Sequence, residues 1–221
     1  MNSTNTNITP ISYGFCFKPP VGCFGYATIL AINDEGKKIL FDTGSYSLRS
    51  VLVEYLKNNF VDYVVVSHLH FDHSSNLDLF INSNTKIVIS RQELEYYDEF
   101  KGKDNDLLAC FDMFKNKLNL MIIDKDFSLT QNCKIVFTPG HTKGHISLEV
   151  TCKNKTYFLC GDCIKTTKEI KKFTTNTNAY DIKLAKTTRE KILKKYTLLF
   201  PGHDVFWGNR NKLKKIKLRR F

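Results

Sequence analysis

The sequence of 221 residues predicts an α/β protein with helix–sheet–sheet–helix layers, a four-layer αββα arrangement. Short apolar runs rich in β-branched residues, which are typical of strands, recur along the chain, and segments with apolar residues at helical spacing separate them. The strands fall into two groups, and each group contains an expected hairpin. Two such groups favour two packed sheets over one simple parallel sheet.

The N-terminal half supplies the first group of strands. Turn residues at 33–36 lie between two apolar runs and predict a hairpin. Apolar residues from Leu48 to Leu56 recur at helical spacing. The expected elements, in order, are an irregular N-terminal segment (1–25), two hairpin strands (26–32 and 37–41), a helix (47–58), a strand (62–67), a short helix (74–80), a strand (86–89) and a helix (91–100).

The C-terminal half supplies the second group of strands. Residues 101–119 are polar with scattered Phe and Leu, and the length of this segment favours a flap or cap over a site. The elements expected after it are two strands (120–123 and 133–137), a hairpin (145–150 and 156–160), a helix (180–195), a strand (197–200) and a basic C-terminal tail (207–221). No linker or low-complexity segment interrupts the chain, so residues 1–221 are expected to form a single domain.

The composition is typical of soluble globular proteins. Hydrophobic residues make up 42%, and no apolar run is long enough to span a bilayer. The polar N-terminus lacks the basic-then-apolar order of a secretory signal, so a cytoplasmic protein is the simplest expectation. The seven cysteines show no disulfide spacing, which favours free, buried thiols, and the isolated pair Cys160 and Cys163 is a weak redox or zinc signal.

The formal net charge of +11 attracts phosphates and anionic surfaces. The lysines are spread along the chain, and only residues 212–220 form a concentrated basic run. Its alternation of apolar and basic residues favours a lysine-protected edge strand over a nucleic-acid-binding arm. Nucleic acid is therefore an alternative partner that we do not favour, and a homodimer is compatible with the sequence.

The histidines cluster in a way that indicates a metal site. All six lie in three short strand-to-loop junctions: His68, His70, His73, His141, His145 and His203. On an extended segment His68 and His70 project to the same side, and the chain must turn to bring Asp72 and His73 nearby. Imidazole and carboxylate are ligands for zinc and similar divalent ions. Together with Asp72 and Asp162, the histidines are numerous enough to bind two ions.

These motifs resemble the metallo-β-lactamase-fold hydrolase superfamily. The resemblance covers about residues 26–206. It rests on five elements in the expected order: Asp42-Thr43-Gly44, His68-Leu69-His70-Phe71-Asp72-His73, Pro139-Gly140-His141-Thr142-Lys143-Gly144-His145, Gly161-Asp162 and Pro201-Gly202-His203-Asp204. It implies a four-layer αββα metallo-β-lactamase sandwich with the active site at one edge of the β layers.

By position, the resemblance implies two divalent ions, with Zn2+ expected and Fe2+ or Mn2+ as alternatives. The implied ligands are His68, His70 and His141 for the first ion, Asp72, His73 and His203 for the second, and Asp162 as the bridge. Asp72 and Asp162 are the expected catalytic carboxylates. Asp42 and His145 are expected to orient ligands without binding metal.

The implied activity is that of a binuclear metal-dependent hydrolase (EC class 3). A metal-bridging hydroxide would attack an ester, thioester or lactone-type small substrate, and Asp162 would shuttle a proton to the leaving group. Homoserine-lactone lactonases share the histidine run and the segment 91–96, but they have a tyrosine three residues beyond the bridging aspartate, where this chain has Lys165. The sequence therefore indicates the chemistry and leaves the substrate open.

Two alternatives belong to other classes of enzyme. Residues 76–80 are similar to those of a compact group of metal-dependent RNA or DNA endonucleases, and the basic tail adds some weight to this alternative. A persulfide dioxygenase of this fold uses a single iron, and the complete two-metal ligand set argues against that activity.

Overall fold

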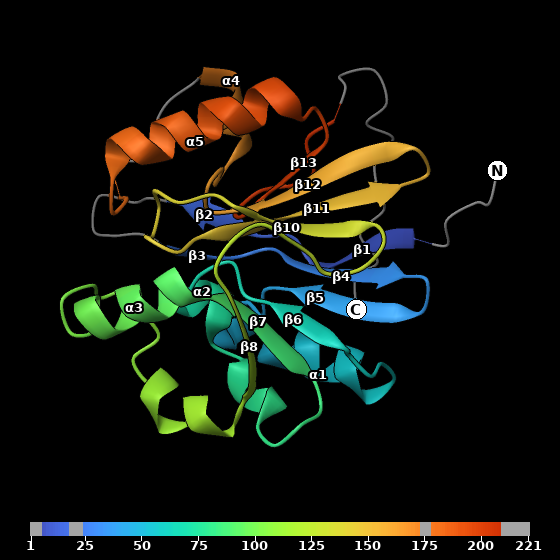
Figure 1. Ribbon diagram of the computed structural model, residues 1–221, viewed down its shortest axis with the longest axis vertical. Helices are drawn as coiled ribbons and strands as arrows, with labels where there is room; N and C mark the ends of the chain where they lie inside the picture. Colours follow the sequence, from blue (N-terminus) through green and yellow to red (C-terminus); the bar gives the residue numbers. More distant parts are fainter. Residues whose placement is uncertain (1–5, 18–23, 173–177, 209–221) are drawn as a thin grey trace.

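Figure 1 shows the computed structural model of the protein, which describes residues 6–17, 24–172 and 178–208. Two large β-sheets lie against each other in the middle. Helices α1 (Arg49–Lys57) and α3 (Arg91–Phe100) cover the outer side of one sheet, and α4 (Thr167–Lys172) and α5 (Ile182–Lys195) cover the outer side of the other. The predicted αββα fold class is confirmed.

The first sheet contains six strands in the order β1-β4-β5-β6-β7-β8. β1, β4 and β5 pair antiparallel, whereas β5 to β8 run parallel. The strands are β1 (Thr6–Ser12), β4 (Ile29–Asp34), β5 (Lys37–Phe41), β6 (Tyr63–Val65), β7 (Lys86–Ser90) and β8 (Asn119–Ile123). Because β5 and β6 are parallel, Asp42 and the histidine run follow them at the same edge of the sheet.

The second sheet contains five strands in the order β13-β12-β11-β10-β9. β12 and β13 pair in parallel, and the other neighbours pair antiparallel. The strands are β9 (Phe127–Ser128), β10 (Cys133–Phe137), β11 (Ile146–Cys152), β12 (Lys155–Gly161) and β13 (Leu199–Pro201). Outside the two large sheets, β2 (Phe15–Phe17) pairs with β3 (Phe24–Tyr26), α2 spans Phe71–Ser74, and short 3-10 helices span Tyr46–Leu48, Leu77–Phe80, Phe111–Met113 and Lys115–Lys117.

Both long hairpins reverse in two-residue turns. In the β4–β5 turn, Glu35 and Gly36 have φ values of 52° and 91°, and in the β11–β12 turn Lys153 and Asn154 have φ values of 49° and 60°. Positive φ at both central residues is the signature of the type I′ turn, whose twist matches that of the strands. The two turns lead into the N-terminal ends of β5 and β12.

The central strands are buried on both faces. In β4, Leu30 and Ile32 pack between the two sheets, whereas Ala31 packs on the opposite face with Leu52 of α1 and Tyr97 of α3. This alternation follows from the period of two along a strand. Strands that are covered on both faces have continuous apolar runs, and such runs allowed most of these strands to be predicted from the sequence.

The N-terminal segment is more regular than the sequence predicts. Residues 1–25 are expected to be irregular, but Thr6–Ser12 forms β1 at the edge of the first sheet, with Ile8 opposite Ile32 of β4. The pairing becomes irregular between Pro10 and Ser12. An edge strand tolerates a proline because its outward N–H side needs no partner.

The prediction of one strand over 26–32 is wrong, because β3 ends at Tyr26 and β4 begins at Ile29. Thr28 causes the break. Its backbone N–H donates to the Gly202 carbonyl at 2.7 Å and its hydroxyl to the Pro201 carbonyl at 3.1 Å. These hydrogen bonds connect the chain to the loop after β13.

The predicted helix over 74–80 is also wrong in its bounds. The chain makes one helical turn at Phe71–Ser74 and a separate 3-10 turn at Leu77–Phe80. Asn76 lies between them, and its amide donates to the carbonyls of residues 43–45 at 2.9, 3.3 and 3.0 Å. These contacts anchor the loop after β5 to the histidine run.

Five large apolar side chains of the segment 101–119 belong to the core, so the interpretation as a flap is wrong for its second half. Its large apolar side chains are buried against the first sheet and α3: Leu107, Leu108, Phe111, Phe114 and Leu118. Scattered Phe and Leu in a polar segment can therefore indicate irregular backbone that packs on a core.

Two further expectations concern the ends of the chain and membranes. The concentrated basic run of the tail lies outside the described residues, although Trp207 still pairs with Leu199 through two backbone hydrogen bonds of 2.8 Å. Within the described ranges, no helix combines the length and the apolar character needed to span a bilayer.

Phe111→Ala tests the packing of residues 107–119. Phe111 is fully buried, so we expect the substitution to lower the free energy of unfolding by about 3–5 kcal/mol. Met113, on the same 3-10 helix, is 79% exposed, and Met113→Ala should change it by less than about 0.5 kcal/mol. Urea unfolding measures the free energy of unfolding of both variants. Equal losses in the two variants would contradict the assigned packing of Phe111.

Candidate metal centre

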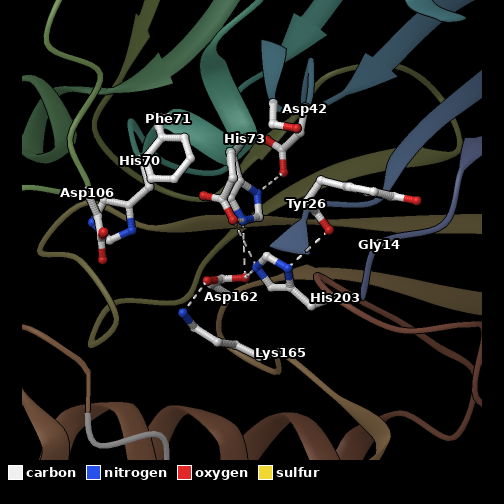
Figure 2. A network of polar contacts seen from close by, with 12 residues as sticks. Gly14, Tyr26, Asp42, His70, Phe71, His73, Asp106, Asp162, Lys165 and His203 are labelled. Carbon is white, nitrogen blue, oxygen red and sulfur yellow. Dashed lines mark hydrogen bonds and ion pairs between the residues drawn. The ribbon is translucent and has the colours of Figure 1, made fainter. Parts of the chain in front are cut away.

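Polar side chains from loops distant in the sequence meet at one edge of the two sheets (Figure 2). They follow the C-terminal ends of β5, β6, β10, β12 and β13, so the rigid strands fix where each loop begins. The histidines there are buried, and Asp162 is 5% exposed. All nine residues that the sequence singles out as ligands or orienting groups lie at this edge.

Three groups of these side chains have their ligand atoms within 4.8 Å of one another. The groups are His68, His70 and His141; His68, His73 and Asp162; and Asp72, His73 and His203. The first and third groups share no residue. The edge thus contains two neighbouring sets of nitrogen and oxygen ligands.

Asp162 contacts histidines of both sets, and Figure 2 shows its contacts with His73, His203 and Lys165. Its Oδ1 is 3.2 Å from Nε2 of both His73 and His203, and its Oδ2 is 3.2 Å from Nε2 of His141. Lys165 donates to Oδ2 at 2.7 Å. One carboxylate therefore faces both sets, which is the arrangement that a bridging ligand needs.

The residues fit a metal ion by a direct structural test. His68 Nε2, His73 Nε2 and Asp162 Oδ1 are buried and have no hydrogen-bond partner among the described residues. Nδ1 of His70 lies 3.0 Å from Nε2 of His141. Two ligand nitrogens on a tetrahedral zinc ion lie about 3.3 Å apart, given Zn–N bonds of about 2.0–2.1 Å. The three unpartnered atoms and the close His70–His141 nitrogen pair thus fit the ligand atoms of a metal ion.

Each of the five clustered imidazoles is held through the nitrogen that faces away from the centre. Four use Nδ1, at 2.9 Å from Ser67 Oγ (His68), 2.7 Å from Asp42 Oδ2 (His73), 3.1 Å from the Asn178 carbonyl (His141) and 3.2 Å from the Tyr26 carbonyl (His203). His70 is reversed and uses Nε2, 3.2 Å from Asp104 Oδ2. Such partners fix the tautomer and the ring orientation of metal-binding histidines.

Asp42 is fixed at the end of β5. It accepts hydrogen bonds from the N–H and the hydroxyl of Ser67 at 2.7 and 2.9 Å, in addition to its contact with His73. Its φ of 61° is unusual for a residue other than glycine, although Asp tolerates this region better than most residues. The strained backbone places the carboxylate beneath the histidine run.

His145 supports the loop that carries Asp162. Its Nε2 accepts from the Asp162 N–H at 2.9 Å, and its Nδ1 contacts the Thr138 hydroxyl at 2.8 Å. Burial lowers the pKa of His145 to about 3, so the ring is neutral at physiological pH. It contacts the backbone of the site and belongs to none of the three ligand groups.

The charge of the site suits a cation. Burial and the neighbouring imidazoles hold the pKa of His68 well below its usual value, and burial together with Lys165 does the same for His141. These rings are therefore neutral, which is the form that binds metals. Burial opposes the charged form of His73, but Asp162, Asp72 and Asp42 raise its pKa well above the usual value. The carboxylates thus attract positive charge to the second set.

Glu93 of α3 is a site residue that sequence reasoning missed. It is fully buried, and its carboxylate accepts from the Leu69 N–H at 2.8 Å and the Thr142 hydroxyl at 2.6 Å. It therefore joins the His68–His70 loop to the His141 loop. The spacing of Ser90 and Glu93 fits a helix-capping box, and the Glu93 N–H does donate to the Ser90 hydroxyl at 3.0 Å.

Gly202 shows why the loop before His203 needs a glycine. A Cβ at this position would lie 2.4 Å from Asp162 Oδ1 and 2.7 Å from the Gly161 carbonyl. Any side chain would push the Asp162 carboxylate out of its place between the two ligand sets.

A cavity of about 490 Å3 opens beside His70 and His141. The rings of Tyr96, Phe100 and Tyr180 form part of its wall, with centroid distances of 4.7, 5.5 and 5.8 Å. The remaining wall is mostly polar and comes from His70, His141 and residues 103–106 and 178–179. The cavity is large enough for a small organic molecule next to the candidate metal centre.

Cys160 and Cys163 lie outside the ligand groups. Both are buried in the apolar cluster beneath α5, and Cys163 Sγ is 3.5 Å from the Ser147 hydroxyl. Cys160 and Cys163 are free thiols in the structure.

An αββα sandwich with two histidine–aspartate sets at one sheet edge defines the class of metallo-β-lactamase-fold proteins. The sequence profile of the Metallo-beta-lactamase superfamily matches residues 21–203. The chain therefore belongs to this superfamily, as the sequence motifs predict.

Among characterised relatives, the chain is similar to the N-acyl homoserine lactonase of Bacillus cereus, with 31% identity over 147 residues. That match covers 65% of this chain but only 56% of the lactonase. The structure resembles a quorum-quenching N-acyl homoserine lactone lactonase (TM-score 0.71, 22% identity, 93% of this chain and 94% of the other). It also resembles AidC, a dizinc quorum-quenching lactonase (TM-score 0.61, 19% identity, 83% and 74%). At these identities the two structural similarities show a common fold.

Glu93→Gln tests whether the buried carboxylate joins the two histidine loops. A glutamine keeps one acceptor and turns the other into an NH2 donor, so either the Leu69 N–H meets a second donor or the Thr142 hydroxyl must reverse and accept. We expect the free energy of unfolding to fall by about 1–3 kcal/mol. Glu95→Gln, two residues further on the same helix and exposed, is the matched control and should cost less than about 0.5 kcal/mol. Urea unfolding in the presence of a chelator separates this effect from metal binding.

Proposed function

We propose that the protein is a binuclear metal-dependent hydrolase of small esters, thioesters or lactones. The observation that carries this proposal is the position of Asp162, whose two oxygens face two separate ligand sets at 3.2 Å. A structural site needs one closed set of ligands, whereas paired sets with a shared carboxylate suit metal-assisted hydrolysis.

We assign the residues of the two sets to separate ions. The ligands are His68, His70 and His141 for the first ion, Asp72, His73 and His203 for the second, and Asp162 as the bridge. Zinc is the proposed metal, because sites rich in imidazole suit it and because a dizinc lactonase shares the fold. Fe2+ and Mn2+ are the alternatives to be separated by metal analysis.

The ions, when bound, would supply a water of lowered pKa as nucleophile and polarise the substrate carbonyl. The chain's own residues do the rest. The cavity beside His70 and His141 holds the substrate, and its aromatic wall excludes water from one side. Asp162 takes the proton that the attacking water releases and returns it to the leaving group, which is an oxygen in esters and lactones and a sulfur in thioesters. Burial opposes the charged form of Asp162, but Lys165 and the neighbouring histidines hold its pKa well below the usual value.

The similarity to N-acyl homoserine lactonases supports lactones as one substrate class. Because the chain spans little more than half of the length of the curated lactonases that it matches, we keep the proposal at the level of the bond that is hydrolysed. Lys165, next to Asp162, is a cation where those lactonases are expected to have a tyrosine. The Lys165 ammonium is already paired with Asp162, so this difference by itself favours no substrate class.

Asp162→Ala tests the bridging role. We expect the metal content of purified protein to fall from about two ions to about one per chain and turnover to fall by at least about 100-fold. Asp124→Asn, which alters an exposed carboxylate paired with Arg91, should retain both ions. Elemental analysis measures the metal content of both variants, and a hydrolysis assay measures their turnover. Two tightly held ions with full activity in Asp162→Ala would contradict the bridging assignment.

A hydrolysis panel on metal-replete protein tests the substrate class. Lactones, thioesters and simple esters should be cleaved, and a chelator should abolish the activity. Cleavage of RNA or a phosphodiester without cleavage of any ester would favour the nuclease alternative. One bound iron with persulfide oxidation would favour the dioxygenase.

A further inference from the structure

His70 differs from the other clustered imidazoles in the nitrogen that it presents. Its Nδ1 faces His141 Nε2 at 3.0 Å, and its Nε2 faces Asp104 Oδ2 at 3.2 Å. A neutral imidazole carries one proton and one free lone pair. For Nδ1 to offer its lone pair to an ion, the proton has to be on Nε2, where it needs an acceptor.

Asp104 is held so that it can be this acceptor. Its Oδ1 accepts from the Asp106 N–H at 3.0 Å, and its Oδ2 accepts from the Tyr96 hydroxyl at 2.7 Å. The Asp104 N–H donates to the Phe100 carbonyl at 2.9 Å. The carboxylate is therefore fixed from its own backbone, from the next turn of the chain and from α3.

The segment that carries Asp104 is joined to the histidine run by backbone hydrogen bonds. The Phe71 N–H donates to the Asp106 carbonyl at 2.7 Å, and the Leu108 N–H donates to the Leu69 carbonyl at 2.9 Å. These two bonds flank His70 on both sides. Residues 104–108 and 69–71 are thus held in register, and His70 and Asp104 face each other as a consequence.

We propose that Asp104 is the positioning residue of the first metal set, with Tyr96 as its support: Asp104 fixes His70 in the tautomer that presents Nδ1. The proposal rests on the proposed binuclear site. The positioning role adds to the proposed site a residue from the segment 101–119, whose sequence carries no metal-binding motif. Carboxylates that accept from a ligand imidazole raise its basicity as well as fixing its orientation.

The same two residues also line the cavity next to the site. The Tyr96 hydroxyl donates a hydrogen bond to Asp104. The Tyr96 ring is part of the aromatic wall, where it contacts Phe100 and Tyr180. The wall of the proposed substrate cavity and the support of His70 are therefore one structure. A change of either residue should affect metal binding before any substrate is added.

Asp104→Asn is the principal test. If the new amide oxygen faces the Asp106 N–H, the NH2 group faces His70 and favours the wrong tautomer. In the opposite orientation, the NH2 group faces the Asp106 N–H, so two donors meet and the side chain loses the contact that fixes it. We expect zinc affinity at one of the two positions to fall about 10–100-fold while the other position keeps its affinity. Competition with a chromophoric chelator measures both affinities, and the absorption spectrum of the Co2+-loaded protein should change.

Two further variants test the support of Asp104 and provide a control. Tyr96→Phe removes the hydroxyl but keeps the ring, and it should weaken the same position by a smaller factor. Asp112→Asn lies on the same segment, where Asp112 pairs with Lys101 and Lys115, and it should leave both affinities unchanged. Unfolding midpoints of the metal-free proteins show whether a variant acts through the fold. If Asp104→Asn lowers that midpoint, the zinc affinity of Tyr96→Phe becomes the test: a loss at the same position supports the positioning role, and wild-type affinity at both positions overturns it.

The outcomes separate this inference from the proposed function. If the wild-type protein binds two ions and Asp104→Asn binds both with wild-type affinity, the positioning role is wrong and the binuclear site stands. An equal loss in Asp112→Asn would also overturn the positioning role. If the wild-type protein binds fewer than two ions, the proposed function fails and the positioning role fails with it.

Discussion

The carboxylate of Asp162, buried among imidazoles, is the contact on which the rest of the site depends. An ionised carboxylate in the interior is costly unless opposite charge and hydrogen bonds surround it. Here Lys165 pairs with one oxygen, and the backbone N–H of Asp162 bonds to His145. The other oxygen has no hydrogen-bond partner among the described residues. This oxygen faces Nε2 of His73 and of His203 at 3.2 Å, so the fold holds a negatively charged atom against two imidazoles at the junction of its two sheets.

The sheets make this arrangement possible because they fix the starting points of the loops. Asp42 follows β5, the histidine run follows β6, Asp162 follows β12 and His203 follows β13. Neighbouring parallel strands bring their carboxyl ends to the same edge, so residues far apart in the sequence converge without long connections. Hydrogen bonds between loops, such as those of Glu93 with both histidine loops, then fix the positions of the side chains.

The sequence allowed the side chains that cluster at the candidate metal centre and most strands to be predicted, because both produce local patterns. The histidine run and the Gly–His and Gly–Asp pairs have fixed spacing, and strands such as β6 are apolar on both faces. Asp104 and Glu93 escaped prediction because neither belongs to a metal-binding motif, and the capping-box spacing of Glu93 indicates only the start of a helix. Their roles depend on contacts with His70 and Leu69, which only the folded chain creates.

Errors in the predicted element bounds have the same physical cause. Thr28 divides one apolar run into two strands because its backbone bonds to Gly202, and Asn76 divides a helix because its amide binds three carbonyls after β5. In both cases a contact distant in the sequence overrides a sound local preference. Both residues lie next to loops of the candidate site, where the demands of the site and of local propensity conflict.

The type I′ turns at Glu35–Gly36 and Lys153–Asn154 have a practical consequence for protein engineering. They lie at the ends of β5 and β12 opposite to Asp42 and Asp162, and each is a minimal reversal between paired strands. An affinity tag, a fluorophore attachment site or a new chain terminus could be introduced at either turn, away from every proposed ligand. The protein therefore offers two grafting points for reporters of its folding and metal content.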